Sequence, residues 1–289
     1  MFYQPGMMDA LADYDSASYV IFGVPFDRTS SFRAGSRWAP DAIRSATANF
    51  ESYNSFFDID ISDVPAHDAG NFEAGALVDD VLDELYLDVL NIVDDGKIPI
   101  MMGGEHSLTL PCVKACAKHA GEDLGIVVLD AHFDLRDEFE GMKYNHACVS
   151  RHILEEVTEN YVSIGIRSGP KEEWDYAKEN NVRYYTPEEV TEKGIKGLTE
   201  EINEYLDCEN IYISLDMDAL DPAFAPGLGT PEPFGLSSVQ VRDIIRKLAP
   251  IARGFDVVEI SPEYDNGQTA ILGAKYIREF IAAHAASIR

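Results

Sequence analysis

Short apolar runs rich in β-branched residues recur along the chain, at residues 19–22, 98–102, 124–129, 161–166, 210–215 and 254–260. Most of their side chains are apolar, and they do not alternate with polar ones. Continuous apolar runs of this length are typical of strands that are covered on both faces, as in a parallel sheet. The pattern therefore predicts strands at the centre of a layered fold.

Segments of helical character lie between these runs, at residues 76–95, 107–120, 146–158, 170–180, 195–206, 237–249 and 267–287. Strands that alternate with helices form a mainly parallel sheet between helical layers, joined by right-handed crossovers. No linker, repeat or low-complexity stretch divides the chain, so we predict one three-layer α/β/α domain over residues 1–289. A (β/α)8 barrel is the alternative at this length. In both architectures, chemistry belongs at the carboxyl ends of the strands.

The charge of the chain narrows its partners. The 289 residues include 51 acids and 23 lysines and arginines, which gives a net charge of −28 with neutral histidines. A large basic surface for nucleic acid or for an anionic membrane is therefore not expected. A negative field favours cations, either metal ions or amine and guanidinium substrates, although a solvated acidic surface is an equally good explanation.

Four cysteines are too few for a disulfide framework in a chain of this length. Cys112 and Cys116 have no second pair to complete a zinc site, so we expect them on a buried helix face. The first residues show no basic segment followed by an apolar one, and no apolar run approaches the roughly 20 residues of a membrane span. We therefore expect a cytoplasmic protein with reduced thiols and no transmembrane segment.

Three of the apolar runs end in groups of histidines and acids, which are candidate metal ligands. These are His106 after run 98–102, Asp130, His132 and Asp134 after run 125–129, and Asp216 and Asp218 after run 211–215. Alternation along a continued strand would place the members of each group on one side. An isolated Asp-X-Asp more often caps a turn, and an isolated buried histidine is usually only hydrogen-bonded. Together, however, the three groups favour a metal site, with Glu105 supporting the ligands rather than binding the ion.

Aspartates at the ends of buried strands need a cation nearby, because a desolvated carboxylate otherwise protonates. Arg136 is the one basic residue interleaved with these motifs. Four aspartates and two neutral histidines match the charge of two divalent cations, whereas one would leave about two negative charges uncompensated. Oxygen ligands with one imidazole for each ion suit Mn²⁺ better than a structural zinc, which prefers cysteine.

With these motifs in order, the sequence resembles the ureohydrolase family of arginases and agmatinases, and it is most similar to the agmatinases. The matching segments are Gly103-Gly104-Glu105-His106-Ser107, 130–134, 214–222, 229–233 and an N-terminal stretch from Gly23 to Arg44. The resemblance implies an arginase-like α/β/α fold and a hydrolase with two Mn²⁺ ions per subunit. One ion would take His106, Asp130, Asp134 and Asp216, and the other His132, Asp130, Asp216 and Asp218. It also implies a homo-oligomer, a trimer or a hexamer.

A guanidinium carbon resists attack because its positive charge is delocalised, and water is too weak a nucleophile at neutral pH. Two metal ions that share a bridging water would supply hydroxide. The resemblance implies that Asp134 orients this hydroxide and that His146 supplies the proton for the leaving amine. It also implies that Glu259 holds the guanidinium.

The substrate we expect is agmatine, which would yield putrescine and urea. The segment 135–141 lacks the Asn and Ser/Thr pattern with which arginases bind the α-carboxylate and α-amine of arginine, and its acids suit a free amine. Arg136 supports guanidinobutyrate if it faces the pocket, but we expect it to pair with Asp137, Glu138 and Glu140. Glu263 could contact a longer polyamine such as aminopropyl-agmatine. Arginine and a non-catalytic metal-binding homologue are further alternatives.

Overall fold

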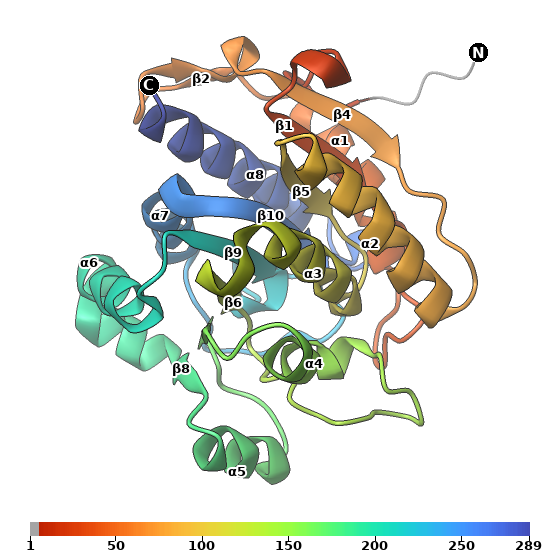
Figure 1. Ribbon diagram of the computed structural model, residues 1–289, viewed down its shortest axis with the longest axis vertical. Helices are drawn as coiled ribbons and strands as arrows, with labels where there is room; N and C mark the ends of the chain where they lie inside the picture. Colours follow the sequence, from red (N-terminus) through yellow and green to blue (C-terminus); the bar gives the residue numbers. More distant parts are fainter. Residues whose placement is uncertain (1–5) are drawn as a thin grey trace.

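The computed structural model describes residues 6–289, and one parallel sheet of eight strands runs through it (Figure 1). The strands pair in the order β4-β1-β5-β10-β9-β6-β7-β8. Their bounds in that order are Ala66–Asn71, Tyr19–Gly23, Ile98–Met102, Ala252–Val258, Asn210–Asp216, Leu124–Leu129, Tyr161–Ile164 and Arg183–Tyr185. A small antiparallel pair, β2 (Tyr53–Asn54) and β3 (Ile59–Asp60), lies outside this sheet.

Eight α-helices in the described residues cover the sheet. They are α1 (Ala39–Thr47), α2 (Val78–Asp94), α3 (Thr109–Ala120), α4 (Val149–Glu156), α5 (Lys171–Glu179), α6 (Pro187–Leu206), α7 (Ser238–Leu248) and α8 (Gln268–Ser287). Helices α6 and α7 each begin with a capping box, in which the first side chain and the residue three positions on satisfy each other's backbone N–H groups. Gly194 interrupts α6 with a positive φ of 65°.

The apolar strands bury both faces and thereby create two cores. In β6, Val127 and Leu129 belong to the core that also contains side chains of α1, α6, α7 and α8, whereas Ile126 and Val128 belong to the core that contains side chains of α2 to α5. All six residues of β6 are buried. Because successive side chains of a strand point to opposite faces, a continuous apolar run fills both cores. The predicted three-layer α/β/α architecture is confirmed, and the barrel alternative is wrong.

The register of the central strands brings their carboxyl ends together. Leu129 of β6 pairs with Leu215 of β9, and Asp216 at the end of β9 pairs with Val258 of β10. Val257 of β10 in turn pairs with Met102 of β5. The segments that follow these four strands therefore meet at one edge of the sheet, as expected for a parallel α/β protein.

The loop after β1 is held against the loop after β5 by a close backbone approach. Glu105 N–H donates to the Phe26 carbonyl at 2.9 Å. A β-carbon on Gly104 would lie only 1.7 Å from the same carbonyl oxygen, so no larger residue fits there. This approach brings the β1 loop to the edge where the central strands end.

A buried ion pair joins α1 to the edge strand β4. Arg44 donates from Nε and Nη2 to the two carboxylate oxygens of Asp68, each at 2.8 Å. The side chains are only 5% and 6% exposed. Asp68 also accepts from the backbone N–H groups of Met7 and Gly70, so its hydrogen-bonding capacity is well used.

None of the helices in residues 6–289 is both long and apolar enough to span a bilayer.

We predict that Asp68→Asn lowers the free energy of unfolding by about 3 kcal/mol, because it leaves the buried Arg44 guanidinium with only the exposed Asp41, at 3.6 Å, as a counter-charge. Thermal unfolding followed by circular dichroism measures this effect. Asp175→Asn is the matched control, since Asp175 pairs with Lys171 on the exposed surface of α5 and should cost less than about 1 kcal/mol. Equal losses in the two variants would contradict the role given to the buried pair.

Candidate functional site

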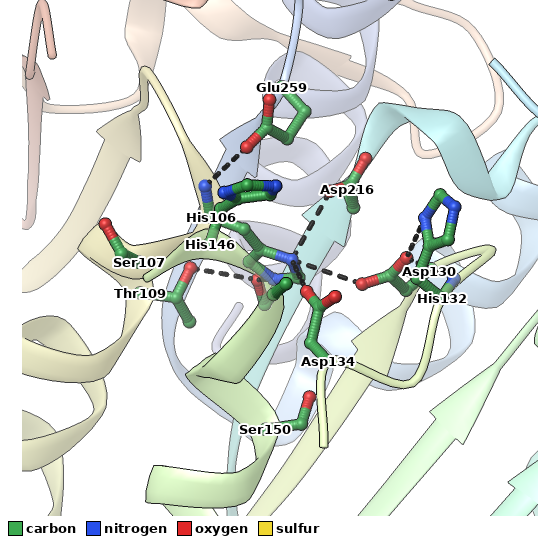
Figure 2. Close-up of polar contacts among 12 residues, drawn as sticks. His106, Ser107, Thr109, Asp130, His132, Asp134, His146, Ser150, Asp216 and Glu259 are labelled. Carbon is green, nitrogen blue, oxygen red and sulfur yellow. Dashed lines mark hydrogen bonds and ion pairs between the residues drawn. The ribbon is translucent and has the colours of Figure 1, made fainter. Parts of the chain in front are cut away.

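The structure brings all six candidate metal ligands together at the carboxyl edge of the central strands. Figure 2 labels five of them, all but Asp218. His106 follows β5, and Asp130 directly follows β6 and leads into the loop that carries His132 and Asp134. Asp216 is the last residue of β9, and Asp218 lies in the single turn after it. The ends of three strands, far apart in the sequence, thus supply one cluster.

Three carboxylates surround one ring nitrogen of His106. Its Nδ1 lies 3.1 Å from Asp130 Oδ2, 3.2 Å from Asp134 Oδ2 and 3.3 Å from Asp216 Oδ2. A ring nitrogen carries at most one hydrogen, so it can donate to only one of these oxygens. The others face lone pairs at short range, which is unfavourable without a cation among them.

His132 forms a second group next to the first. Its Nδ1 lies 3.0 Å from Asp218 Oδ2 and 3.6 Å from Asp130 Oδ1. Asp130 therefore turns one oxygen toward each histidine, as a carboxylate shared by two metal ions would. In each group, ligand atoms from three residues lie within 4.8 Å of one another: His106, Asp130 and Asp216 in one, and Asp130, His132 and Asp218 in the other.

The donor set fits a pair of divalent cations. Among the described residues, the buried atoms His106 Nδ1 and Asp130 Oδ2 make no well-formed hydrogen bond with a protein partner. Buried polar atoms are nearly always satisfied, and these two face each other at 3.1 Å, an arrangement that fits a cation between them. Carboxylate oxygens with one imidazole for each ion suit a metal such as Mn²⁺. Burial, and then the charges of Asp218 and Asp130, raise the pKa of Asp216 well above its usual range.

The other ring nitrogen of His106, Nε2, is held by a buried hydroxyl that is itself bound to a buried carboxylate. Nε2 lies 3.1 Å from Ser214 Oγ, which donates to Asp256 Oδ1 at 2.6 Å. Tyr212 and Thr109 donate to the other oxygen of Asp256. Since the Ser214 hydrogen goes to Asp256, its oxygen accepts from His106 Nε2–H, which leaves Nδ1 free to face a metal. The sequence analysis did not single out Asp256, although an acid inside the apolar run 254–260 is a visible signal.

Asp134 and Glu259 both have left-handed backbone conformations. Their φ angles are 52° and 63°, which residues other than glycine rarely adopt. Glu259 Oε1 accepts the backbone N–H of His106 at 2.8 Å, and the Glu259 N–H donates to the Gly104 carbonyl at 2.9 Å. Backbone strain of this kind persists where the surroundings force it and is typical of functional sites.

A cavity of about 140 Å³ lies over the cluster. Its lining residues are Ser31, His132, Asp134, Arg136, Phe139, His146, Ala147, Gly169, Pro170, Glu173 and Thr230. In the metal-free protein, burial, followed by the positive charges that His106 and His132 carry there, lowers the pKa of His146 to about 4. His146 and Asp134 thus share the cavity, while Glu263 is exposed and lies beside Gly35.

Arg136 lines this cavity, but its predicted partners are wrong. Its Nε donates to Glu173 at 2.9 Å, and its guanidinium lies over the Phe139 ring at 4.2 Å. Glu173 comes from α5, 37 residues away, and is buried. Asp137, Glu138 and Glu140, which we expected to pair with Arg136, are exposed.

Comparison with known proteins decides the family. The model of the arginase family matches residues 17–283. The chain belongs to the arginase family. The solved agmatine ureohydrolase of Thermoplasma volcanium is 44% identical with a TM-score of 0.94, covering 100% of this chain and 97% of that one. The predicted arginase-like fold is thereby confirmed.

Two curated members of the arginase family are similar over nearly their whole length. An agmatinase of Bacillus anthracis is 36% identical over 277 residues, which are 93% of this chain and 92% of the relative. An N(1)-aminopropylagmatine ureohydrolase of Thermococcus kodakarensis is 36% identical over 282 residues, 95% and 93% of the two chains. The chain is thus a hydrolase of the arginase family, as the motifs predicted.

We predict that Glu259→Gln stabilises the metal-free protein. Burial, and then the charge of Glu105, raise the pKa of Glu259 to about 8. An acid whose folded pKa is raised destabilises the fold increasingly as the pH rises from its unfolded pKa, near 4.3, toward its folded one. The amide keeps the oxygen that accepts from His106 N–H but carries no charge. The melting temperature should therefore rise by about 2–4 °C at pH 8, and hardly at pH 5.

Melting curves in chelator at the two pH values check this, with the exposed Glu263→Gln as the matched control. A lower melting temperature for Glu259→Gln at pH 8 would contradict the stated cost of this carboxylate.

Proposed function

We propose that this chain hydrolyses agmatine to putrescine and urea and uses two Mn²⁺ ions per subunit. The observation that carries the proposal is the pair of His/Asp groups that share Asp130, beside the buried Glu259 carboxylate. The similarity to an agmatine ureohydrolase and to agmatinases supports the choice of substrate. The free state of all four cysteines supports work in the cytoplasm. The resemblance of the motifs supports a homo-oligomer, a trimer or a hexamer.

We assign the metal ligands as the sequence motifs suggest. One ion would be held by His106, Asp130, Asp134 and Asp216, and the other by His132, Asp130, Asp216 and Asp218. When bound, two divalent cations lower the pKa of water enough for it to act as a nucleophile at neutral pH. The contacts around His106 Nδ1 support the whole first set, and those around His132 Nδ1 support Asp130 and Asp218 in the second.

Glu259 is placed to hold the substrate's guanidinium group. One carboxylate oxygen accepts from His106 N–H, and the other lies near Gly229, where no side chain competes for it. A guanidinium donates to a carboxylate through a planar fork, so this contact would fix its carbon beside the cluster. A cationic substrate would also stabilise the charged form of Glu259, which burial disfavours.

Asp134 and His146 supply orientation and a proton. Asp134 turns one oxygen toward His106 and lines the cavity, so it can accept a hydrogen bond from the attacking water and aim its lone pair at the guanidinium carbon. Attack at this carbon, with Asp134 accepting the proton that the water loses, would give a tetrahedral intermediate. The bond that then breaks joins the guanidinium carbon to the nitrogen that carries the alkyl chain. His146 would protonate that departing nitrogen, so that putrescine and urea leave.

Residues of the cavity wall bear on the choice between substrates that differ at the end opposite the guanidinium group. The positive charge of Arg136 would repel the distal ammonium of agmatine, but Glu173 neutralises the charge of Arg136. The net charge of −28 further favours a dicationic substrate. Guanidinobutyrate is the second candidate, because Arg136 lines the cavity and a guanidinium can bind its carboxylate. The exposed position of Glu263 gives aminopropyl-agmatine less support.

The first test measures urea release from agmatine, arginine, guanidinobutyrate and aminopropyl-agmatine by the purified protein with Mn²⁺, against a chelated sample. We expect the highest kcat/KM for agmatine and about two ions per chain by mass spectrometry of the metal. Asp130→Asn should lose the metal and at least about 10³-fold in turnover, because it removes the shared carboxylate. Asp243→Asn on α7 is the control and should keep both.

If urea is released mainly from another compound of the panel, that compound is the substrate instead of agmatine, and the proposed hydrolytic chemistry still holds. A protein that holds metal but releases no urea from any of the four would favour the non-catalytic homologue.

A second test separates the two substrate candidates through Arg136→Gln. If agmatine is the substrate, removing a positive charge from the cavity wall should leave its KM unchanged or lower it severalfold. If guanidinobutyrate is the substrate, its KM should rise at least tenfold, because a carboxylate loses its partner. Arg242→Gln on α7, remote from the cavity, is the control.

A further inference from the structure

The loop after β1 reaches the rim of the cavity and is held there by a carboxylate. Glu105, which is fully buried, accepts the backbone N–H of Thr29 at 2.7 Å and the Thr29 hydroxyl at 2.6 Å. Ser107 donates to the same carboxylate at 2.5 Å. These contacts bind Glu105 to the loop after β1. Glu105 therefore positions this loop, in addition to the supporting role beside the metal ligands that we expected for it.

Thr29 in turn contacts His146 through two nitrogens. The backbone N–H of His146 donates to Thr29 Oγ1 at 2.9 Å, and the ring Nδ1 lies 3.2 Å from the same oxygen. Ring Nε2 lies on the other side, 3.3 Å from the hydroxyl of the exposed Ser31. The His146 ring also packs edge-on against Phe139 across the cavity. The histidine is therefore held from one side and open on the other.

Hydrogen accounting fixes which ring nitrogen carries the proton. A hydroxyl has one hydrogen, and the hydrogen of Thr29 goes to the Glu105 carboxylate. The Thr29 oxygen can then only accept, and it accepts the His146 backbone N–H with one lone pair. Its second lone pair faces Nδ1 at 3.2 Å, where another lone pair would repel it, so the ring hydrogen of neutral His146 lies on Nδ1. The lone pair of neutral His146 consequently lies on Nε2, which faces Ser31 and the cavity.

We propose that Thr29, anchored by Glu105, is a positioning residue that holds His146 in its Nδ1–H tautomer with Nε2 directed at the substrate. This inference rests on the proposed function only for the identity of the proton's destination. Nε2 takes up a proton from solvent, directly or relayed through the Ser31 hydroxyl, and delivers it to the departing alkyl nitrogen. The Nδ1–H group keeps its hydrogen bond to Thr29 Oγ1 throughout, so the imidazole ring does not have to rotate.

The test compares Thr29→Val, which has nearly the same shape but no hydroxyl, with Thr29→Ser, which keeps one. We expect Thr29→Val to lower kcat about tenfold, the effect of losing one hydrogen bond to a group that transfers a proton. KM and metal content should stay unchanged, and Thr29→Ser should recover most of kcat. Thr199→Val in α6 removes a similarly buried hydroxyl far from the cavity and should change none of these.

Nuclear magnetic resonance tests the tautomer without any substrate. In the full-length chain with ¹⁵N-labelled histidine, freed of metal by chelator, two-bond ¹H–¹⁵N spectra report which ring nitrogen is protonated. His146→Gln assigns the signal. We expect Nδ1–H in the wild type and in Thr29→Ser, and a shift toward Nε2–H in Thr29→Val. Thr29→Ala replaces Thr29→Val if the valine variant does not fold.

The two readouts separate the possible failures. An Nε2–H tautomer in the wild type, or an unchanged tautomer in Thr29→Val and Thr29→Ala, would overturn the positioning role whatever the substrate is. The predicted tautomer change in a protein that releases no urea from agmatine would instead uphold the positioning of His146 and remove the proposed function. A Thr29→Val variant that loses its metal would also count against the inference, since the hydroxyl would then support the cluster.

Discussion

The structure depends on keeping four carboxylates and two imidazoles close together where water is scarce. Asp130 follows a strand that is wholly buried, Asp216 ends one that is buried after its first residue, and the two strands, β6 and β9, pair in register. Their charges repel one another, and burial disfavours the charged forms. A pair of divalent cations would reverse the sign of both effects, because the same carboxylates that repel each other would then share an ion. The fold supplies the proximity, and in the proposed function bound metal would stabilise the cluster.

The packing of the two cores holds the repelling carboxylates in place. Strands that are apolar on both faces are fixed by packing along their length, so their carboxyl ends cannot drift apart to relieve repulsion. The same rigidity forces Asp134 and Glu259 into left-handed backbone conformations that a looser loop would abandon. Strain and desolvation are therefore concentrated where the chemistry is expected, and the helices on both faces of the sheet compensate for them.

The sequence predicts the parts of this design that are local. Continuous apolarity identifies the central strands, and the residues that follow runs 98–102, 124–129 and 210–215 identify the cluster. The edge strands β4 and β8 escaped prediction, because an edge is partly solvated and needs no apolar run: β4 reads Ala-His-Asp-Ala-Gly-Asn. The partner of Arg136 was predicted wrongly for a different reason. Nearby acids look suitable, but Glu173 on α5 is brought in by the tertiary fold.

The buried carboxylates of Asp256 and Glu105 each orient a histidine through a hydroxyl group, but they leave different ring nitrogens free. Asp256 takes the hydrogen of Ser214, whose oxygen faces Nε2 of His106, and this leaves Nδ1 for a metal. In the inferred arrangement, Glu105 takes the hydrogen of Thr29, whose oxygen faces Nδ1 of His146 and leaves Nε2 for the substrate. A hydroxyl between carboxylate and imidazole fixes the tautomer yet keeps the negative charge one group away. The carboxylate therefore orients the ring without forming a direct ion pair, which would favour the doubly protonated imidazole that can neither bind metal nor accept a proton.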